Sequence, residues 1–328
     1  MNARPDRMPE RPIARARRNL LILAMDHRAS LVKEIYGIGA EPSAAESARV
    51  SADKALIFDG LLRAIDQGVD KSMVGVLVDE RYGASVASRA KVAGVDLAMP
   101  VERSGQKLFM LEYGSIDDGE WLRHIEAFDP DQVKILVRDN PAADGERELQ
   151  LDRLATVSAA LRESGRTLLL ELLLPGTPTQ LASVDHDVLR YDRDLRPALT
   201  VQEIHELQEA GVEPNIWKVE GLETTAAAAQ IVAAARRVQR DDVTCIVLGR
   251  DAPRDRLDHW LRVAAGAGFS GFAIGRSIWE QPLVDYLAGR ESADRLVARV
   301  AESFTHFAGS YLAGAPRSAP RSSNAEAD

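Results

Sequence analysis

Three charged residues lie inside otherwise apolar runs of this sequence, where burying a charge is costly. They are Lys218 in NIWKVEG, Glu171 in LLLELLL and Lys134 in VKILV. A lysine is rarely buried without a partner, because removing its ammonium group from water costs several kcal/mol. A desolvated lysine amine is also a nucleophile that forms Schiff bases with carbonyl compounds, and a nearby carboxylate can transfer protons for it. The three residues are therefore candidates for catalysis.

A structural explanation competes with this one. A lysine at a strand end can simply reach solvent, and a buried Lys–Glu pair can hold strands together without reacting. Two lysines beside one glutamate nevertheless make a reaction site, because the second cation favours the neutral, nucleophilic form of the first. Which explanation holds depends on the elements that place Lys134, Glu171 and Lys218.

Eight apolar, β-branched runs alternate with amphipathic helical patterns along the chain. The expected strands cover residues 20–26, 73–79, 95–102, 133–139, 167–174, 215–220, 243–250 and 271–276. Continuous apolar runs are typical of parallel strands that are covered on both faces. Eight βα units in one chain predict a single-domain α/β fold, a parallel eight-stranded (β/α)8 TIM barrel. A doubly wound sheet is the alternative, but GIGAEP after the first run lacks its glycine fingerprint.

The carboxyl ends of barrel strands carry the active site in this fold, and each expected strand here ends in charged residues. We expect the charged side chains of Lys134, Glu171 and Lys218 to point into the barrel mouth. The loops after strands seven and eight are frequent phosphate sites, where backbone N–H groups and a helix N-terminus meet the anion. Each of these loops pairs a glycine with an arginine, which predicts phosphate binding by Gly249, Arg250, Gly275 and Arg276.

Two segments are expected to modify the simple barrel. Residues 106–114 predict a small extra strand in the third unit, and residues 175–199 read as a long loop without elements of its own. Long loops on the working face tend to contact substrate. Asp192, Arg193 and Arg196 are therefore candidates for binding a substrate carboxylate.

Composition excludes several other classes of function. The net charge of −9 and the pI of about 5.3 argue against nucleic acid as a partner, and no apolar run is long enough for a membrane span. The single cysteine, Cys245, offers neither a disulfide nor a thiolate metal site and suits the cytoplasm. The six histidines show no metal-ligand spacing, so we expect neither a metal nor a cofactor.

The ends of the chain differ from its middle. Residues 1–18 are rich in arginine and are expected to form a mobile basic arm, and the polar, proline-broken residues 315–328 are expected to be a disordered tail. Residues 19–314 form the predicted barrel domain. Assembly into a homo-oligomer stays open, and the helical stretch 292–312 could serve an interface or cap the barrel.

Six motifs in strand order carry a family resemblance: AMDHR, VDERYG, VKILVRD, LLLELLLP, WKVEG and GFAIGRSIW. Together they resemble the class I tagatose-bisphosphate aldolase superfamily. Within it, the nearest match is the 5-dehydro-2-deoxyphosphogluconate aldolase domain of inositol catabolism, which is often fused behind 5-dehydro-2-deoxygluconokinase. The resemblance extends from residue 20 to about residue 314 and covers the whole barrel.

The resemblance implies roles for individual residues. Lys218 would be the Schiff-base lysine, Glu171 the acid/base and Lys134 the second active-site lysine. Gly275 and Arg276 match the phosphate loop. The resemblance further places three residues in the mouth of the barrel: Asp26, Arg28 and Glu80. His27 stands where tagatose-type members have glutamine, which bears on the identity of the sugar.

The expected activity is that of a cofactor-independent class I aldolase acting on a small phosphorylated sugar. The favoured substrate is 2-deoxy-5-keto-D-gluconate 6-phosphate, cleaved to dihydroxyacetone phosphate and malonate semialdehyde. Tagatose 1,6-bisphosphate and 6-deoxy-6-sulfofructose 1-phosphate are alternatives for the same chemistry. A phosphosugar isomerase or epimerase that uses Glu171 without a covalent lysine, and a non-catalytic phosphosugar-binding protein, are alternatives of other kinds.

Overall fold

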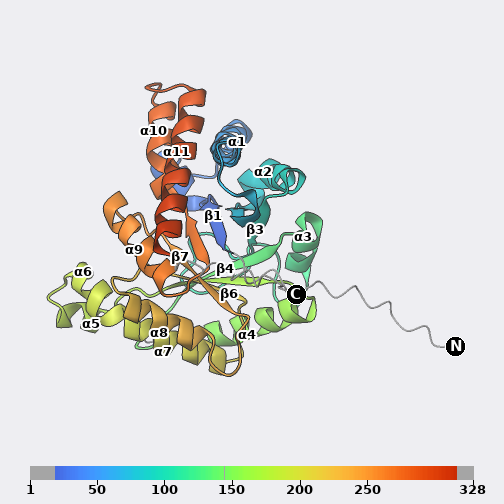
Figure 1. Cartoon of the computed structure of the whole chain (residues 1–328). Helices are drawn as coiled ribbons and strands as arrows, with labels where there is room; N and C mark the ends of the chain where they lie inside the picture. The colour runs from blue at the N-terminus through green and yellow to red at the C-terminus, as the bar shows by residue number, and fades with distance from the viewer. Residues whose placement is uncertain (1–18, 144, 316–328) are drawn as a thin grey trace, which may run out of the picture.

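Eight parallel strands close into a barrel in the computed structural model, which describes residues 19–143 and 145–315 (Figure 1). The strands pair in sequence order, β1 with β2 through to β8, which returns to β1. Their bounds are β1 Leu20–Ala24, β2 Val74–Leu77, β3 Asp96–Pro100, β4 Gln132–Arg138, β5 Leu168–Leu173, β6 Ile216–Val219, β7 Thr244–Leu248 and β8 Gly271–Ile274. The TIM barrel predicted from the sequence is confirmed.

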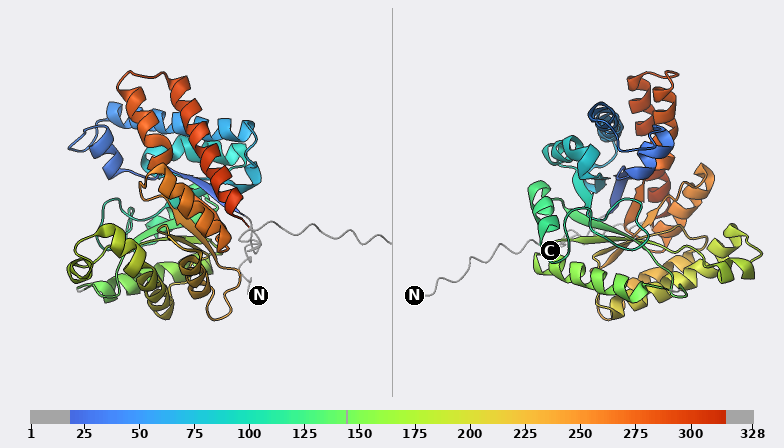
Figure 2. Two further views of the ribbon diagram at one scale, coloured as in Figure 1. Left: turned by 60° about the vertical axis from the view of Figure 1, so that its left-hand side comes forward. Right: turned by 180° about the vertical axis from the view of Figure 1, so that it is seen from behind.

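Helices surround the barrel, and most of them connect one strand to the next (Figure 2). The longer ones are α1 Ala44–Asp66, α2 Glu80–Ala93, α3 Glu120–Phe128, α4 Arg147–Glu163, α7 Arg196–Glu209, α8 Thr225–Ala235, α9 Arg254–Gly266, α10 Arg276–Leu287 and α11 Ala293–Gly314. The short ones are η2 Leu31–Ile35, η3 Lys71–Met73, α5 Pro178–Ser183, α6 Val188–Arg190 and η4 Tyr191–Leu195. Helix α11 packs against α1, α9 and α10. No helix in the described ranges has the length and apolarity needed to cross a membrane.

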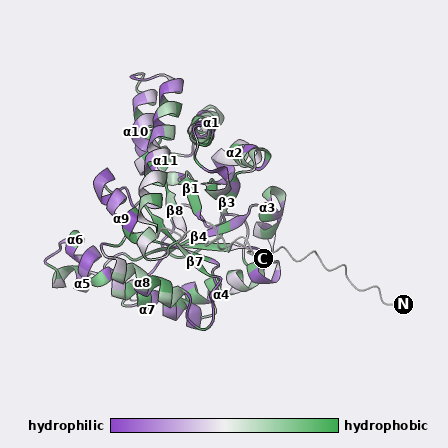
Figure 3. Cartoon of the chain, viewed as in Figure 1, coloured by the Kyte–Doolittle hydropathy of each residue, from purple (hydrophilic) through white to green (hydrophobic). Residues whose placement is uncertain are grey.

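Two separate apolar clusters result from the alternation of side chains along the strands. The outer cluster joins the strands to the helices, whose hydrophobic faces turn toward the barrel (Figure 3). The smaller inner cluster consists of inward-facing residues, among them Ile22, Leu169, Ile216 and Ile246. It fills the barrel interior, as expected for an eight-stranded barrel. Charged residues further along these strands therefore stand above an apolar floor.

The segment 175–199 is more ordered than the sequence indicated. Instead of a loop without elements it forms α5, α6 and η4, which Figure 1 places at the edge of the molecule, and the first turn of α7. Pro197 lies in the first turn of α7, where proline's missing N–H costs nothing. The extra strand expected at residues 106–114 was also wrong, since only a single antiparallel bridge joins Leu111 to Glu102.

The tails predicted at either end, a mobile arm over 1–18 and a disordered tail over 315–328, lie outside the described residues, apart from Ala315 at the end of α11.

A buried group of charges fixes the end of β4 to α7. Arg147 contacts Asp139 at 3.2 Å and Glu203 at 2.8 Å, and Glu203 is fully buried. Burial raises the pKa of Glu203 to about 8, with a further contribution from the charge of Asp139, and the arginine only partly opposes this. One oxygen of each carboxyl group, Asp139 Oδ2 and Glu203 Oε1, has no hydrogen-bond partner among the described residues, and we infer that the two groups share a proton.

We expect this carboxyl pair to make the stability depend on pH. A carboxyl group with a raised folded pKa contributes stability that is complete below its unfolded pKa and is lost as the pH rises through the folded value. Between pH 6 and pH 9 the wild type should lose about 2–3 kcal/mol that Glu203→Gln keeps, measured by urea unfolding. Glu206→Gln removes the more exposed partner of Arg147 and is the matched control. Parallel pH curves for wild type and E203Q would contradict the shared proton.

Candidate active site

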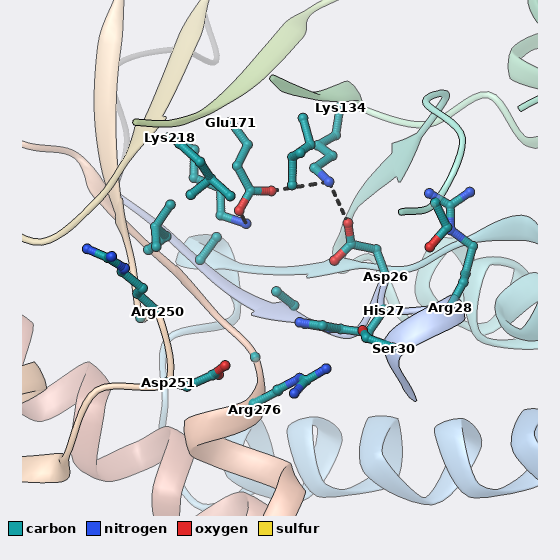
Figure 4. Close-up of a pocket in the computed structure, with 18 of the residues that line it drawn as sticks. Asp26, His27, Arg28, Ser30, Lys134, Glu171, Lys218, Arg250, Asp251 and Arg276 are labelled. Carbon is teal, nitrogen blue, oxygen red and sulfur yellow. Dashed lines mark hydrogen bonds and ion pairs between the residues drawn. The ribbon is translucent and has the colours of Figure 1, made fainter. Parts of the chain in front are cut away.

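A cavity of about 400 Å³ opens at the carboxyl ends of the strands. Its lining residues come from every strand except β2 and β3, and from the loops that follow β1, β3, β7 and β8. The cavity stands above the apolar floor of the barrel, and its walls carry both carboxylates and cations (Figure 4).

Lys218 and Glu171 face each other on neighbouring strands. They are register partners of β6 and β5, so their side chains leave the sheet on the same face. The Lys218 Nζ lies 2.8 Å from Glu171 Oε1, and the exposed fractions of the two residues are 3% and 8%. The structure therefore places an amine and a proton acceptor in contact at the bottom of the cavity.

Lys134 on β4 lies at the centre of three carboxylates. Its Nζ is 2.7 Å from Asp26 Oδ2, 2.8 Å from Glu102 Oε1 and 3.1 Å from Glu171 Oε2. Glu171 thus bridges the two lysines, because each of its carboxylate oxygens contacts one of them (Figure 4). The three candidates for catalysis, Lys134, Glu171 and Lys218, are thus brought together with Asp26, which was expected in the mouth of the barrel.

The structure adds Glu102, the last residue of the expected strand 95–102, to this group. Glu102 lies just beyond the end of β3. Only the closed barrel shows that this part of the chain faces Lys134.

The charges of the cluster determine the protonation of its carboxyl groups. Burial alone would raise the pKa of the Asp26 carboxyl, but the attraction of Lys134 and Lys218 outweighs it and lowers that pKa. The same balance lowers the pKa of Glu171. For Glu102 burial dominates and raises the pKa. For Lys134 the three carboxylates outweigh burial and raise the pKa, so this lysine stays charged.

The end of β1 is held in place from behind by Lys54 of α1. The buried Lys54 ammonium forms an ion pair with Asp79 and donates hydrogen bonds to the carbonyl oxygens of Met25, at 2.7 Å, and His27, at 3.1 Å. Asp79 in turn caps α2 by accepting from Tyr82 N. The backbone on both sides of Asp26 is therefore fixed before any substrate binds.

Gly249, Arg250, Gly275 and Arg276 all line the cavity on the side of β7 and β8. Gly275 precedes α10 and supplies no side-chain cap, so the first amides of that 12-residue helix are free to meet an anion. The Arg276 Nη1 lies 2.8 Å from the half-exposed Glu34, and Arg250 lies 2.6 Å from Asp192 and 3.0 Å from Glu220. Both arginines are thus held at the rim, where an anion can compete for them.

Two residues expected in the mouth have other contacts. Arg28 lines the cavity, but its buried guanidinium donates to the Glu102 carbonyl at 2.8 Å and points away from Lys218 (Figure 4). Glu80 does not line the cavity. It is the first residue of α2, and both its carboxylate oxygens accept from His124 Nδ1, at 3.0 and 2.8 Å. The chain turns into α2 directly after Asp79, and this turn carries Glu80 to the outer side of the barrel end.

The residues of segment 175–199 proposed to bind a carboxylate do not line the cavity. Arg196 is buried against Asp192 at 3.1 Å and donates to the carbonyl of Gly221, and Arg193 pairs on the surface with Asp194. Asp192 acts indirectly, because it holds Arg250 at the cavity rim. No group of His, Cys, Asp and Glu side chains suited to a metal ion occurs in the described part of the chain.

A protein-family model matches residues 10–313 of the chain. It is a bacterial family described as "Uncharacterized protein conserved in bacteria (DUF2090)". The chain belongs to this family. The match spans the whole barrel, including every residue of the Lys134 and Lys218 cluster. No curated protein matches the chain.

Solved structures with the same fold include several aldolases. A fructose-bisphosphate aldolase from Plasmodium falciparum is 12% identical, with a TM-score of 0.64, over 93% of this chain and 94% of that one. An archaeal fructose 1,6-bisphosphate aldolase is 16% identical, with a TM-score of 0.54, over 88% and 95% of the two chains. The YdjI aldolase from Escherichia coli K12 is 12% identical, with a TM-score of 0.54, over 91% and 94%. At these identities the likeness establishes the fold.

Proposed function

We propose that this protein is a class I aldolase that cleaves a phosphorylated keto-sugar through a Schiff base on Lys218. The observation that carries the proposal is the buried contact of 2.8 Å between Lys218 and Glu171 in a cavity whose rim carries Arg250 and Arg276. A buried amine beside a carboxylate acceptor is what carbonyl addition requires. The aldolases among the structures of the same fold agree with this chemistry.

The reaction begins when Glu171 takes a proton from Lys218, and the free amine attacks the substrate ketone. Loss of water from the adduct, with Glu171 returning a proton to the departing oxygen, gives an iminium ion. A carboxylate then removes the proton from the hydroxyl group at the scissile bond. Asp26 suits this step because the nearby cations keep it ionised. The bond breaks, its electrons pass to the iminium to form an enamine, and protonation and hydrolysis release the second product.

The phosphate of the substrate would lie at the start of α10. Backbone amides and Arg276 supply donors there, with Arg250 beside them. This side of the barrel, β7 and β8, is adjacent to β6, which carries Lys218. A three-carbon phosphorylated ketone would have its carbonyl carbon at Lys218 and its phosphate at the start of α10. Dihydroxyacetone phosphate is accordingly the product we assign to this half of the site.

The far end of the substrate would meet two further arginines. Two arginines line the cavity across the closed barrel from β7 and β8, Arg103 in the loop after β3 and Arg138 on β4. Arg138 Nη1 donates to the Gln106 carbonyl at 3.4 Å, and neither arginine forms an ion pair among the described residues. An anionic group at the distal end of the substrate fits them. The proposed substrate class is therefore a phosphosugar with a second anionic group at its far end. Within this class we favour 2-deoxy-5-keto-D-gluconate 6-phosphate, a keto-acid whose cleavage gives malonate semialdehyde as the second product.

Replacing Arg138 by alanine tests the distal end. A charge-assisted hydrogen bond contributes about 1.5–3 kcal/mol, so R138A should raise the KM for the keto-acid phosphate roughly 10- to 100-fold. Reaction with dihydroxyacetone phosphate alone should not change, because that compound has no distal anionic group for Arg138 to bind. Arg162→Ala, on the exposed end of α4, is the matched control. An unchanged KM in R138A would remove the distal anion from the proposal.

Trapping with borohydride tests the proposed function itself. The protein is incubated with dihydroxyacetone phosphate, reduced, digested and analysed by mass spectrometry. The expected result is a reduced three-carbon adduct on Lys218 and on no other lysine. If dihydroxyacetone phosphate binds but borohydride yields no adduct, the Schiff base is excluded. That result would favour a phosphosugar isomerase or a binding protein.

A further inference from the structure

The imidazole of His27 lines the cavity without a hydrogen-bond partner. Its Nδ1 is buried and unpartnered, and Nε2 forms no hydrogen bond with the described residues. Leaving a buried polar atom unpaired costs about 1–3 kcal/mol, so such atoms are uncommon in folded proteins. In Figure 4 the ring lies between Asp26 and Arg276, across the cavity from Lys218 and Glu171.

The ring is held in this position by its surroundings. Its plane meets that of Trp279 at 74°, with 5.5 Å between ring centroids, and the Trp279 Nε1 donates to the Ala24 carbonyl at 2.9 Å. On another side it approaches the backbone of Gly275 so closely that a Cβ there would lie 2.9 Å from His27 Cε1. A ring fixed so firmly, yet without a partner, is preorganised for a group that arrives later.

The charge state of His27 suits it to donate a hydrogen bond. Burial, together with the charges of Arg276 and Lys218, lowers the pKa of the imidazole to about 4 against the opposing effect of Asp26. The ring is therefore neutral at physiological pH and carries one N–H. A buried N–H group without an acceptor is rarer than a buried acceptor without a donor. We therefore assign the ring proton to Nε2 and leave the buried Nδ1 unprotonated.

We propose that His27 determines specificity for the phosphorylated arm of the substrate, with Nε2–H donating to an oxygen of its phosphate group. The proposal rests on the proposed function, since the ketone carbon must be at Lys218 and the phosphate at Arg276 for the arm to pass the ring. A neutral donor at this position adds a hydrogen bond to the phosphate without placing a further cation beside Arg276.

The test compares two ketones that differ only in the phosphate. Borohydride trapping on Lys218 is measured at subsaturating dihydroxyacetone phosphate and dihydroxyacetone, with wild type, His27→Phe and His27→Gln. H27F keeps a ring against Trp279 and Gly275 but lacks the donor, and it should lower the second-order trapping rate with the phosphate ester about 10-fold. The rate with dihydroxyacetone should change less than about twofold, and H27Q, whose amide is a donor, should restore most of the loss.

Each other outcome counts against the proposal. Equal losses with the two ketones would mean that His27 only packs the site, and no loss with either would mean that it makes no bond. Should H27F fail to fold, as judged by its melting temperature, His27→Met gives the same comparison. An absence of any Lys218 adduct in the wild type would instead overturn the proposed function, which separates the two failures.

Discussion

Replacing Lys218 by arginine is expected to lower the rate of substrate cleavage by at least about 10⁴-fold, the scale of losses when a covalent nucleophile is removed. Arginine keeps the positive charge opposite Glu171, which lies 2.8 Å from the lysine, so the ion pair and the fold should survive. Its guanidinium does not lose a proton in proteins and forms no Schiff base with a ketone. Steady-state kinetics and borohydride trapping on the same preparation measure both effects.

The result separates the chemistries that this site could support. An isomerase or epimerase would transfer protons through Glu171 and would keep substantial activity in K218R, more than about a tenth of the wild-type rate. Lys107→Arg is a matched control, since Lys107 is exposed on the loop after β3. If K218R cleaves substrate and the trapped adduct appears on Lys134 instead, the two lysines have exchanged the roles proposed for them.

The sequence was sufficient to predict the barrel because its strands are buried on both faces. Such strands appear as uninterrupted apolar runs, and a charge within one is visible against them. Lys134, Glu171 and Lys218 could be identified for that reason. The register that sets Glu171 opposite Lys218 follows from closure of the barrel. The sequence therefore predicted that both side chains point into the barrel mouth, but it did not establish their contact.

Other parts of the site left no comparable signal. Glu102 and Glu80 each follow a strand by a few residues, yet one turns toward Lys134 and the other opens helix α2. The difference lies in the path of the chain after the strand, which side-chain alternation does not encode. His27 is similar, because its lack of a partner depends on Trp279 and Gly275, more than 240 positions along the chain.

Lys134→Met is expected to destabilise the protein by about 3–5 kcal/mol, in addition to abolishing activity. The substitution removes the ammonium that lies within 2.7–3.1 Å of Asp26, Glu102 and Glu171 and leaves three buried carboxyl groups facing one another. Lys218 still compensates Glu171, so the largest effect falls on Asp26 and Glu102. Urea unfolding at pH 7 measures the loss, and Lys91→Met, which breaks a surface contact with Asp129, should stay within about 1 kcal/mol.

The pH dependence of K134M distinguishes lost charge compensation from lost packing. In the wild type the lowered pKa of Asp26 contributes stability that is present above its unfolded pKa and is lost as the pH falls through the folded value. Without Lys134 the folded pKa rises, so the gap between wild type and K134M should narrow from pH 8 to pH 4.5. Adding Glu102→Gln to K134M removes one uncompensated charge and should recover part of the stability at pH 8. A gap that stays constant with pH, unaffected by the second substitution, would mean that Lys134 acts through its hydrocarbon chain rather than as the central cation of the site.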